Sequence, residues 1–135
     1  MFKEIVFETS GVQSWIDLTK HVRDAVEACG VDEGLCCVYN PHTTAGVFVN
    51  SYLDPNTPKD ILHEWDRLIP TRFDFHHQFD TPSDAAGHVK SSLMGTEVTL
   101  IIHQGELMLG HSQGILFAEF DGPRRRRVFV KIVAG

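Results

Sequence analysis

Hydrophobic and polar positions recur with two different periods along this chain, one typical of strands and one typical of helices. Residues 3–9 alternate apolar and polar side chains, as a half-buried strand does. Residues 20–29 instead place Val22, Ala25, Val26 and Cys29 three or four positions apart, and Gly30 follows as a stop signal. Both patterns recur further along, so we expect a chain that contains strands and helices.

The other elements are expected where apolar runs are bounded by Gly, Pro, Asn or Asp. The expected strands cover residues 12–18, 34–39, 45–49, 97–103, 106–109, 114–120 and 127–133. Two further helices are expected over 57–69 and over 82–95, Thr19 is expected to cap the first helix, and Gln104-Gly105 is a hairpin-turn signal. Strands at both ends with helices between them predict an α+β fold with a largely antiparallel sheet and about three helices.

Length and composition predict one domain over residues 1–135. No apolar run approaches the roughly 20 residues that a membrane-spanning helix needs, and the N-terminus has no secretory-signal pattern. Three cysteines, two of them adjacent, argue for the reducing cytoplasm rather than a disulfide framework. The net charge of −6 argues against nucleic-acid binding. We therefore expect a cytoplasmic protein with no membrane or nucleic-acid partner.

The stretch from Pro41 to Pro55 surrounds a short apolar strand with polar side chains. It brings His42, Asn50 and Asp54 together with two threonines, which is more polar chemistry than a core strand requires. Asn and Asp are also common turn formers, so Asp54 and its neighbours have a second interpretation as a simple turn. The functional interpretation makes His42 a metal ligand or a general acid or base that faces a cleft.

Asp84, His88 and Ser92 are four residues apart on the third expected helix, which places them on one face. Asp84 is expected to orient the His88 ring and to select its tautomer. A Ser-His-Asp triad is a second interpretation, but a nucleophilic serine normally sits on a strained turn, whereas Ser92 in mid-helix can bond back to a carbonyl. A surface helix face with an incidental Asp/His pair is the third.

The loop before this helix contains His76, His77 and Asp80, which with His88 have the residue types of a metal or phosphate site. Zinc binds His nitrogens and carboxylate oxygens and keeps an open position in catalytic sites. The metal candidates are His42, His77 and His88, for zinc or magnesium, and the sequence leaves open which of His76 and His77 belongs to the site. No HExxH or CxxC spacing supports them, so they depend on residue type alone.

Four arginines, Arg124 to Arg127, precede the last expected strand. Alternate residues of a strand face opposite sides, so one pair of arginines is expected to enter a cleft and bind phosphate. The alternative is a charged edge that prevents strand pairing. Gln113, next to Gly114, is the one other polar group singled out in this part of the chain.

Four segments together give the chain a resemblance to the YjbQ family, also labelled secondary thiamine-phosphate synthase, over nearly its full length. These segments are His42-Thr43-Thr44-Ala45-Gly46, Asn50 with Asp54-Pro55, residues 84–95, and residues 110–124. Compared with many relatives, the chain differs at Ser51, at Asp84 and at His111-Ser112.

The resemblance implies small α+β subunits that assemble as homotrimers. It also implies an activity that joins hydroxymethylpyrimidine diphosphate to thiazole phosphate and releases pyrophosphate. The residues at the motif positions inherit a catalytic assignment, and these are His42, Asn50, Asp54, His88, Ser92 and Gln113. Arg124 is the expected cofactor-binding residue, because the departing pyrophosphate needs a neutralising charge.

Two functions are therefore expected from the sequence. The first is an enzyme acting on a small phosphorylated substrate, with thiamine-phosphate synthesis as the named reaction. The second is a non-catalytic trimer that binds a metal or another ligand through the same histidines.

Overall fold

The structure, a computed structural model, describes residues 1–135 and contains two antiparallel sheets and three helices. The five-stranded sheet has the order β1-β8-β3-β5-β6, and the three-stranded sheet has the order β2-β7-β4. The strands are β1 (Phe2–Glu8), β2 (Ser14–Asp17), β3 (Gly34–Tyr39), β4 (Ala45–Ser51), β5 (Glu97–His103), β6 (Glu106–Leu107), β7 (Gln113–Glu119) and β8 (Arg125–Ala134). The helices are α1 (Thr19–Cys29), α2 (Asn56–Leu68) and α3 (Pro82–Met94).

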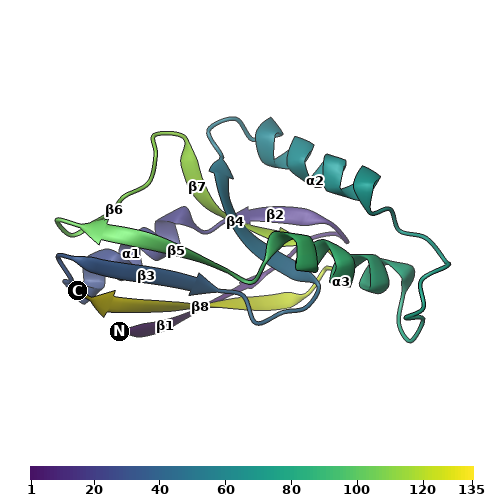
Figure 1. Cartoon of the computed structure of the whole chain (residues 1–135), viewed down its shortest axis with the longest axis horizontal. Coiled ribbons are helices and arrows are strands. Elements are labelled where there is room, and N and C mark those ends of the chain that lie inside the picture. Colours follow the sequence, from purple (N-terminus) through teal and green to yellow (C-terminus); the bar gives the residue numbers. More distant parts are fainter.

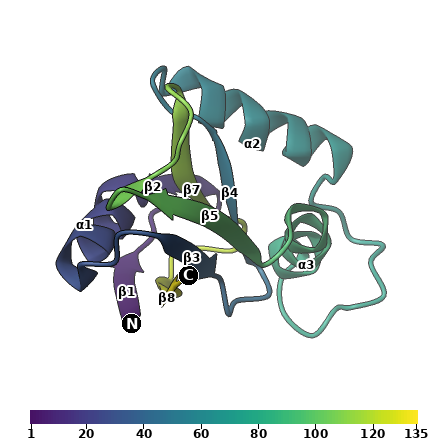
Figure 2. The same cartoon turned by 60° about the vertical axis from the view of Figure 1, so that its left-hand side comes forward.

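The three helices cover different parts of the two sheets (Figures 1 and 2). Helix α1 lies behind the five-stranded sheet in Figure 1 and contacts β8, β6 and β7, so it touches both sheets. Helix α2 packs against β2 and β4, and α3 packs against β4. No helix lies in front of β3, β5 and β8 in Figure 1, which leaves that face of the five-stranded sheet uncovered.

The main core is formed between the two sheets and α1 by residues that alternate along the strands. On β8, Val128, Val130 and Ile132 are buried while their neighbours point outward. They meet Phe117 of β7 and Val22 of α1 in one hydrophobic cluster. A period of two on the strands and a period near 3.6 on the helix therefore converge on the same interior.

The outward residues of the same strands form an apolar surface, which we call the outer face. Its exposed apolar side chains are Phe2, Val6, Leu35, Tyr39, Ile101 and Val133. Cross-strand pairing places Leu35 opposite both Ile101 and Val133, so the patch is continuous across three strands. Exposed apolar patches of this kind mark interaction surfaces in soluble proteins.

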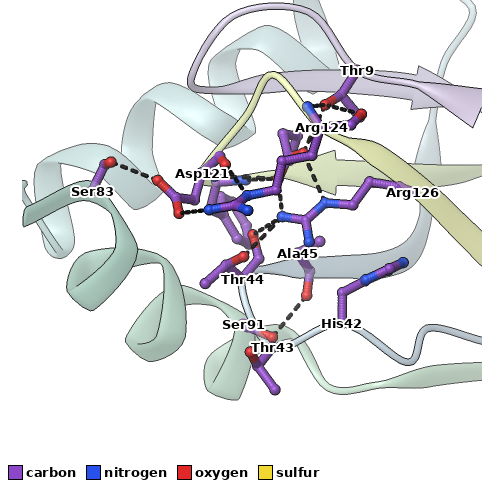
Figure 3. A network of polar contacts seen from close by, with 12 residues as sticks. Thr9, His42, Thr43, Thr44, Ala45, Ser83, Ser91, Asp121, Arg124 and Arg126 are labelled. Atoms are coloured by element: carbon purple, nitrogen blue, oxygen red, sulfur yellow. Dashed lines mark hydrogen bonds and ion pairs between the residues drawn. The ribbon is translucent and has the colours of Figure 1, made fainter. Parts of the chain in front are cut away.

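A buried ion pair joins the two sheets. Glu119, at the end of β7, is fully buried, and Arg126 of β8 is 5% exposed. The guanidinium of Arg126 donates to both carboxylate oxygens of Glu119. It also donates, at 2.8 Å, to the Thr44 hydroxyl (Figure 3). The Thr9 hydroxyl donates to the same carboxylate at 2.7 Å. The pair thus connects β7 and β8 with the end of β1 and the loop before β4.

The α+β class, the antiparallel pairing and the three helices confirm the fold predicted from the sequence. One difference is that the strands divide into two sheets. A second is that Thr19 does not cap α1, so that prediction is wrong. Its hydroxyl instead accepts a hydrogen bond from the Ile115 backbone, and Asp17 accepts one from the Thr19 backbone. No helix has the length and apolar character needed to cross a membrane.

We predict that Arg126→Met lowers the free energy of unfolding by about 3–5 kcal/mol, because it leaves the Glu119 carboxylate buried without its charged partner. Equilibrium urea unfolding measures the change. The matched control is Arg67→Met, which removes an exposed ion pair with Glu64 and is expected to cost less than about 1 kcal/mol. Equal losses in the two variants would contradict the role given to the buried pair.

Candidate metal site

Three side chains with metal-ligand chemistry lie together at the start of α3. One ligand atom from each of His77, Asp84 and His88 falls within 4.8 Å of the others. Asp84 Oδ2 lies 2.7 Å from His77 Nε2 and 3.4 Å from His88 Nε2. The two imidazole rings pack edge to face with centroids 5.3 Å apart. The group combines two nitrogens and one carboxylate.

Local structure explains why these side chains meet. The Thr81 hydroxyl caps α3 by accepting from the Asp84 backbone, and the next turn brings His88 above Asp84 on the same face. Gly87 faces inward, where a Cβ atom would lie 3.2 Å from Thr44. The absence of a side chain at Gly87 therefore lets α3 approach the loop before β4.

That loop sets the orientation of the His88 ring. His88 Nδ1 lies 3.1 Å from the Thr43 carbonyl oxygen, which can only accept a hydrogen bond, so Nδ1 carries the proton. In the neutral ring Nε2 then presents a lone pair, and this atom is the one directed at Asp84. A lone pair and a carboxylate oxygen do not attract each other, whereas a proton on Nε2 or a metal ion between the two atoms would join them.

Asp84 is the buried centre of the group, and its side chain is 11% exposed. Burial alone raises the pKa of this carboxyl. The hydrogen bond from His77 and the nearby His88 outweigh burial, so the pKa lies below its ordinary value. Asp84 is therefore a carboxylate at neutral pH, which is the form that binds cations.

His42 lies on the other side of the Thr43 backbone and is not one of the three clustered residues. The buried Asn40 side chain shapes this loop by accepting from the His42 backbone and donating to the Ala45 carbonyl. His42 Nε2 lies 3.0 Å from the Arg127 backbone nitrogen and 3.1 Å from the Arg127 carbonyl oxygen, and the ring tautomer decides whether it accepts from the first or donates to the second. The ring is thus held against the edge of β8.

A polar cavity of about 380 Å³ lies between His42 and His88. Its other lining residues are Thr43, Ser91, Ser92, Gly95 and Thr96, and none of the lining residues is hydrophobic. We call this cavity the groove. It provides room for a small polar molecule next to the three clustered ligands.

The remaining candidate residues from the sequence are elsewhere or have local partners. Asn50 and Gln113 lie near the far end of β4 and its partner β7, and at about 3.3 Å per residue Asn50 is roughly 20 Å from Thr44. Asp54 accepts from the Asn56 backbone at the start of α2, as the turn interpretation expected. The structure does not bring these three residues to the groove.

Two further candidates also make local contacts. The Ser92 hydroxyl lines the groove but donates back to the His88 carbonyl at 2.9 Å, which is the mid-helix behaviour described above. Arg124 is paired with Asp121, and the hydrogen bond and charge of Asp121 raise its pKa above the ordinary value. The other oxygen of Asp121 accepts from Ser83 of α3 (Figure 3).

Sequence reasoning left His76 and His77 unresolved, and the structure places His77 against Asp84. The sequence analysis did not name Asp84 as a metal ligand, because it expected Asp84 only to orient the His88 ring. The contact between Arg126 and Thr44 gave no sequence signal, because the two residues are 82 positions apart. Glu119 and Arg126 are close in the chain, but they lie on different sheets, and no helix or strand spacing predicts their contact.

A family model described as "UPF0047 protein YjbQ-like" matches residues 3–135. The chain belongs to the YjbQ family. Among curated proteins it is similar to UPF0047 protein MJ1081 of Methanocaldococcus jannaschii, with 43% identity over 93% of this chain and 89% of the relative. It is also similar to UPF0047 protein YugU of Bacillus subtilis, with 36% identity over 98% and 99% of the two chains.

Solved structures of the YjbQ family have the same fold. An uncharacterized conserved family protein from Clostridium acetobutylicum superposes with a TM-score of 0.90 at 43% identity, covering 97% of this chain and 99% of the other. A YbjQ-like protein of unknown function from Sulfolobus solfataricus gives 0.94 at 26% identity, covering 100% and 97%.

These comparisons correct the predicted activity. The relatives are UPF0047 proteins whose names state no reaction, and the Sulfolobus structure is described as a protein of unknown function. The prediction of thiamine-phosphate synthesis is therefore wrong. The YjbQ resemblance established the family and the fold and did not establish a reaction.

We predict that His42 makes the stability of the protein depend on pH below 6.5. Burial, assisted by the positive charge of Arg126, lowers the pKa of His42 from the ordinary 6.5. Between the two pKa values the unfolded chain binds more protons than the folded one, so stability falls as the pH drops through this interval and is fully present above it. Urea unfolding at a series of pH values measures the slope.

The His42→Asn variant isolates this contribution, because it keeps a polar side chain without a titrating ring. The difference in unfolding free energy between wild type and variant should change below pH 6.5 and be constant above it. A difference that is constant across the whole range would contradict the assignment.

Proposed function

We propose that the protein binds a divalent transition metal, zinc in the first place, through His77, Asp84 and His88. Imidazole nitrogens and one carboxylate oxygen are typical zinc ligands. Magnesium prefers an octahedral set of oxygens, which a site with two histidines does not offer. The set of two histidines and one carboxylate therefore favours zinc over magnesium.

The observation that carries the proposal is the direction of the His88 ring. A bond from Nδ1 to a backbone carbonyl is the usual means by which proteins present a histidine nitrogen to a metal. Here the Thr43 carbonyl fulfils that role, and the free Nε2 faces the ionised Asp84. His77 approaches the same carboxylate oxygen from the other side.

Three protein ligands leave one position of a tetrahedral ion open, and an ion held in this way lowers the pKa of a bound water molecule. His88 both belongs to the cluster and lines the groove, so the open position is expected to be reached from there. We therefore favour a metal centre with access to a small polar ligand over a closed structural site. His42 contributes to the groove wall rather than to the ligand set.

We predict that metal-free protein binds zinc and that His77→Ala, Asp84→Ala and His88→Ala each weaken binding more than about tenfold. Loss of residues that only support a ligand already costs 10–100-fold in other sites. Isothermal titration calorimetry gives the affinity, and elemental analysis after dialysis gives the stoichiometry.

His76→Ala and His111→Ala are the matched controls, because each removes a histidine outside the cluster. Both should retain the zinc affinity of the wild type. The metal site would be refuted by cluster variants that bind zinc as tightly as the wild type, or by controls that lose as much affinity as the cluster variants.

We also propose that the protein is a homotrimer. The stoichiometry comes from the family resemblance, and the outer face supports a subunit contact because it leaves Leu35, Ile101 and Val133 more than half exposed. A cytoplasmic location is proposed with it, supported by three cysteines that form no disulfide.

Sedimentation velocity at micromolar concentration is expected to give the mass of a trimer, and Ile101→Asp is expected to give a monomer because it places a charge in the apolar contact. Leu68→Asp is the control, since Leu68 is an equally exposed apolar residue on α2, away from the outer face. A wild-type monomer, or a trimer that survives Ile101→Asp, would contradict the proposed assembly.

A further inference from the structure

The four consecutive arginines divide into two pairs with different environments. Arg124 and Arg126 are committed to the carboxylates of Asp121 and Glu119. Arg125 and Arg127 point the other way, because β8 alternates its side chains, and both are exposed. Only this second pair has guanidinium groups available to a ligand.

Arg127 is held in place on two sides. Its Nη1 lies 3.3 Å from a carboxylate oxygen of Glu4, and its guanidinium carbon stands 5.1 Å from the centre of the Phe129 ring. Arg125 takes part in none of the ion pairs of the structure, although Glu8 is its register partner on β1. Arg127 is thus held in position before a ligand binds, whereas Arg125 has no ion-pair partner.

These arginines open onto a cavity of about 350 Å³ that is lined by Glu4, Val6, His42 and Arg125 to Arg127. A volume of this size suits a small molecule. His42 Nε2 is bound to the Arg127 backbone, which leaves Nδ1 as the free nitrogen of its ring. The two guanidinium groups are positively charged hydrogen-bond donors, which is the chemistry of an anion site.

His42 lines this cavity and also the groove next to His88. His42 is the one residue that lines both cavities, and His88 is the clustered ligand that lines the groove. A molecule bound to the arginines and extended past His42 would reach His88 in the groove.

We propose that Arg125, Arg127 and His42 form a binding site for the oxyanion group of a small molecule, phosphate or carboxylate, whose remaining part extends into the groove. The proposed anion site is argued from the contacts of its own residues and does not require a bound metal. Its position as one half of a site shared with a metal rests on the function proposed above.

A small-molecule oxyanion fits this site better than a nucleic acid does. The chain has a net charge of −6, and Arg125 and Arg127 line one small cavity rather than an extended basic surface. Nucleic-acid affinity requires neutralisation of many phosphates along a surface. Two arginines with one imidazole match a single oxyanion.

The test measures the binding of inorganic phosphate and of malonate by calorimetry, with the protein metal-free and zinc-loaded. We expect saturable binding of at least one of the two anions, and the comparison tells a phosphate site from a carboxylate site. Arg125→Gln should weaken it about tenfold and Arg125→Gln/Arg127→Gln about a hundredfold, since each charged hydrogen-bond partner contributes on this scale. Arg127→Lys keeps the charge and should give an intermediate loss.

Arg67→Gln removes an equal charge from the exposed end of α2 and should leave anion binding unchanged. Circular dichroism and zinc affinity should be the same in all arginine variants, which separates a lost anion site from a lost fold or metal site. His88→Ala should lose zinc and keep anion binding to the metal-free protein. The proposal is overturned if neither anion binds saturably, if the double variant binds as the wild type does, or if Arg67→Gln causes the same loss.

Discussion

The ion pair between Glu119 and Arg126 is the contact on which the fold and the site both depend. A charge without water needs each of its hydrogen-bonding positions filled. The Glu119 carboxylate obtains this from Arg126, from the Thr9 hydroxyl, and from two backbone N–H groups that follow it. Arg126 in turn binds the Thr44 hydroxyl, and the adjacent Thr43 carbonyl orients His88. The direction of one imidazole is therefore traceable to a charge pair between two sheets.

Local pattern was sufficient for most of the fold. The apolar alternation of β8 and the helical spacing of α1 predicted elements within a few residues of those observed, because both faces meet one common core. The division into two sheets was not predictable in this way, since it depends on which strands pair across long stretches of chain. Thr19 shows the same limit: its hydroxyl serves a backbone group of β7, a contact 96 positions away that overrides its capping preference.

The candidate site shows the same difference between local patterns, which the sequence reveals, and long-range contacts, which it does not. Asp84 and His88 were found together because helical spacing is a local rule, and they do share a face. His42 and Asn50 were grouped because they are close in sequence, yet β4 begins after His42 and carries Asn50 to its far end. The alternation of the arginines was anticipated, but which pair is free depends on where Asp121 and Glu119 lie in the folded chain.

The position of His77 has an entropic consequence. Two of the three clustered ligands are fixed on α3, and the third lies only seven positions before Asp84 on the loop that precedes the helix. An ion bound by all three would act as a cross-link across a very short segment, for which the cost of closing the loop is small because that cost grows with the logarithm of its length. A ligand supplied by His42, with far more chain to close, has to be positioned by the whole fold. With such an ion bound, the link between His77 and α3 would need little help from the long-range contacts that orient His88.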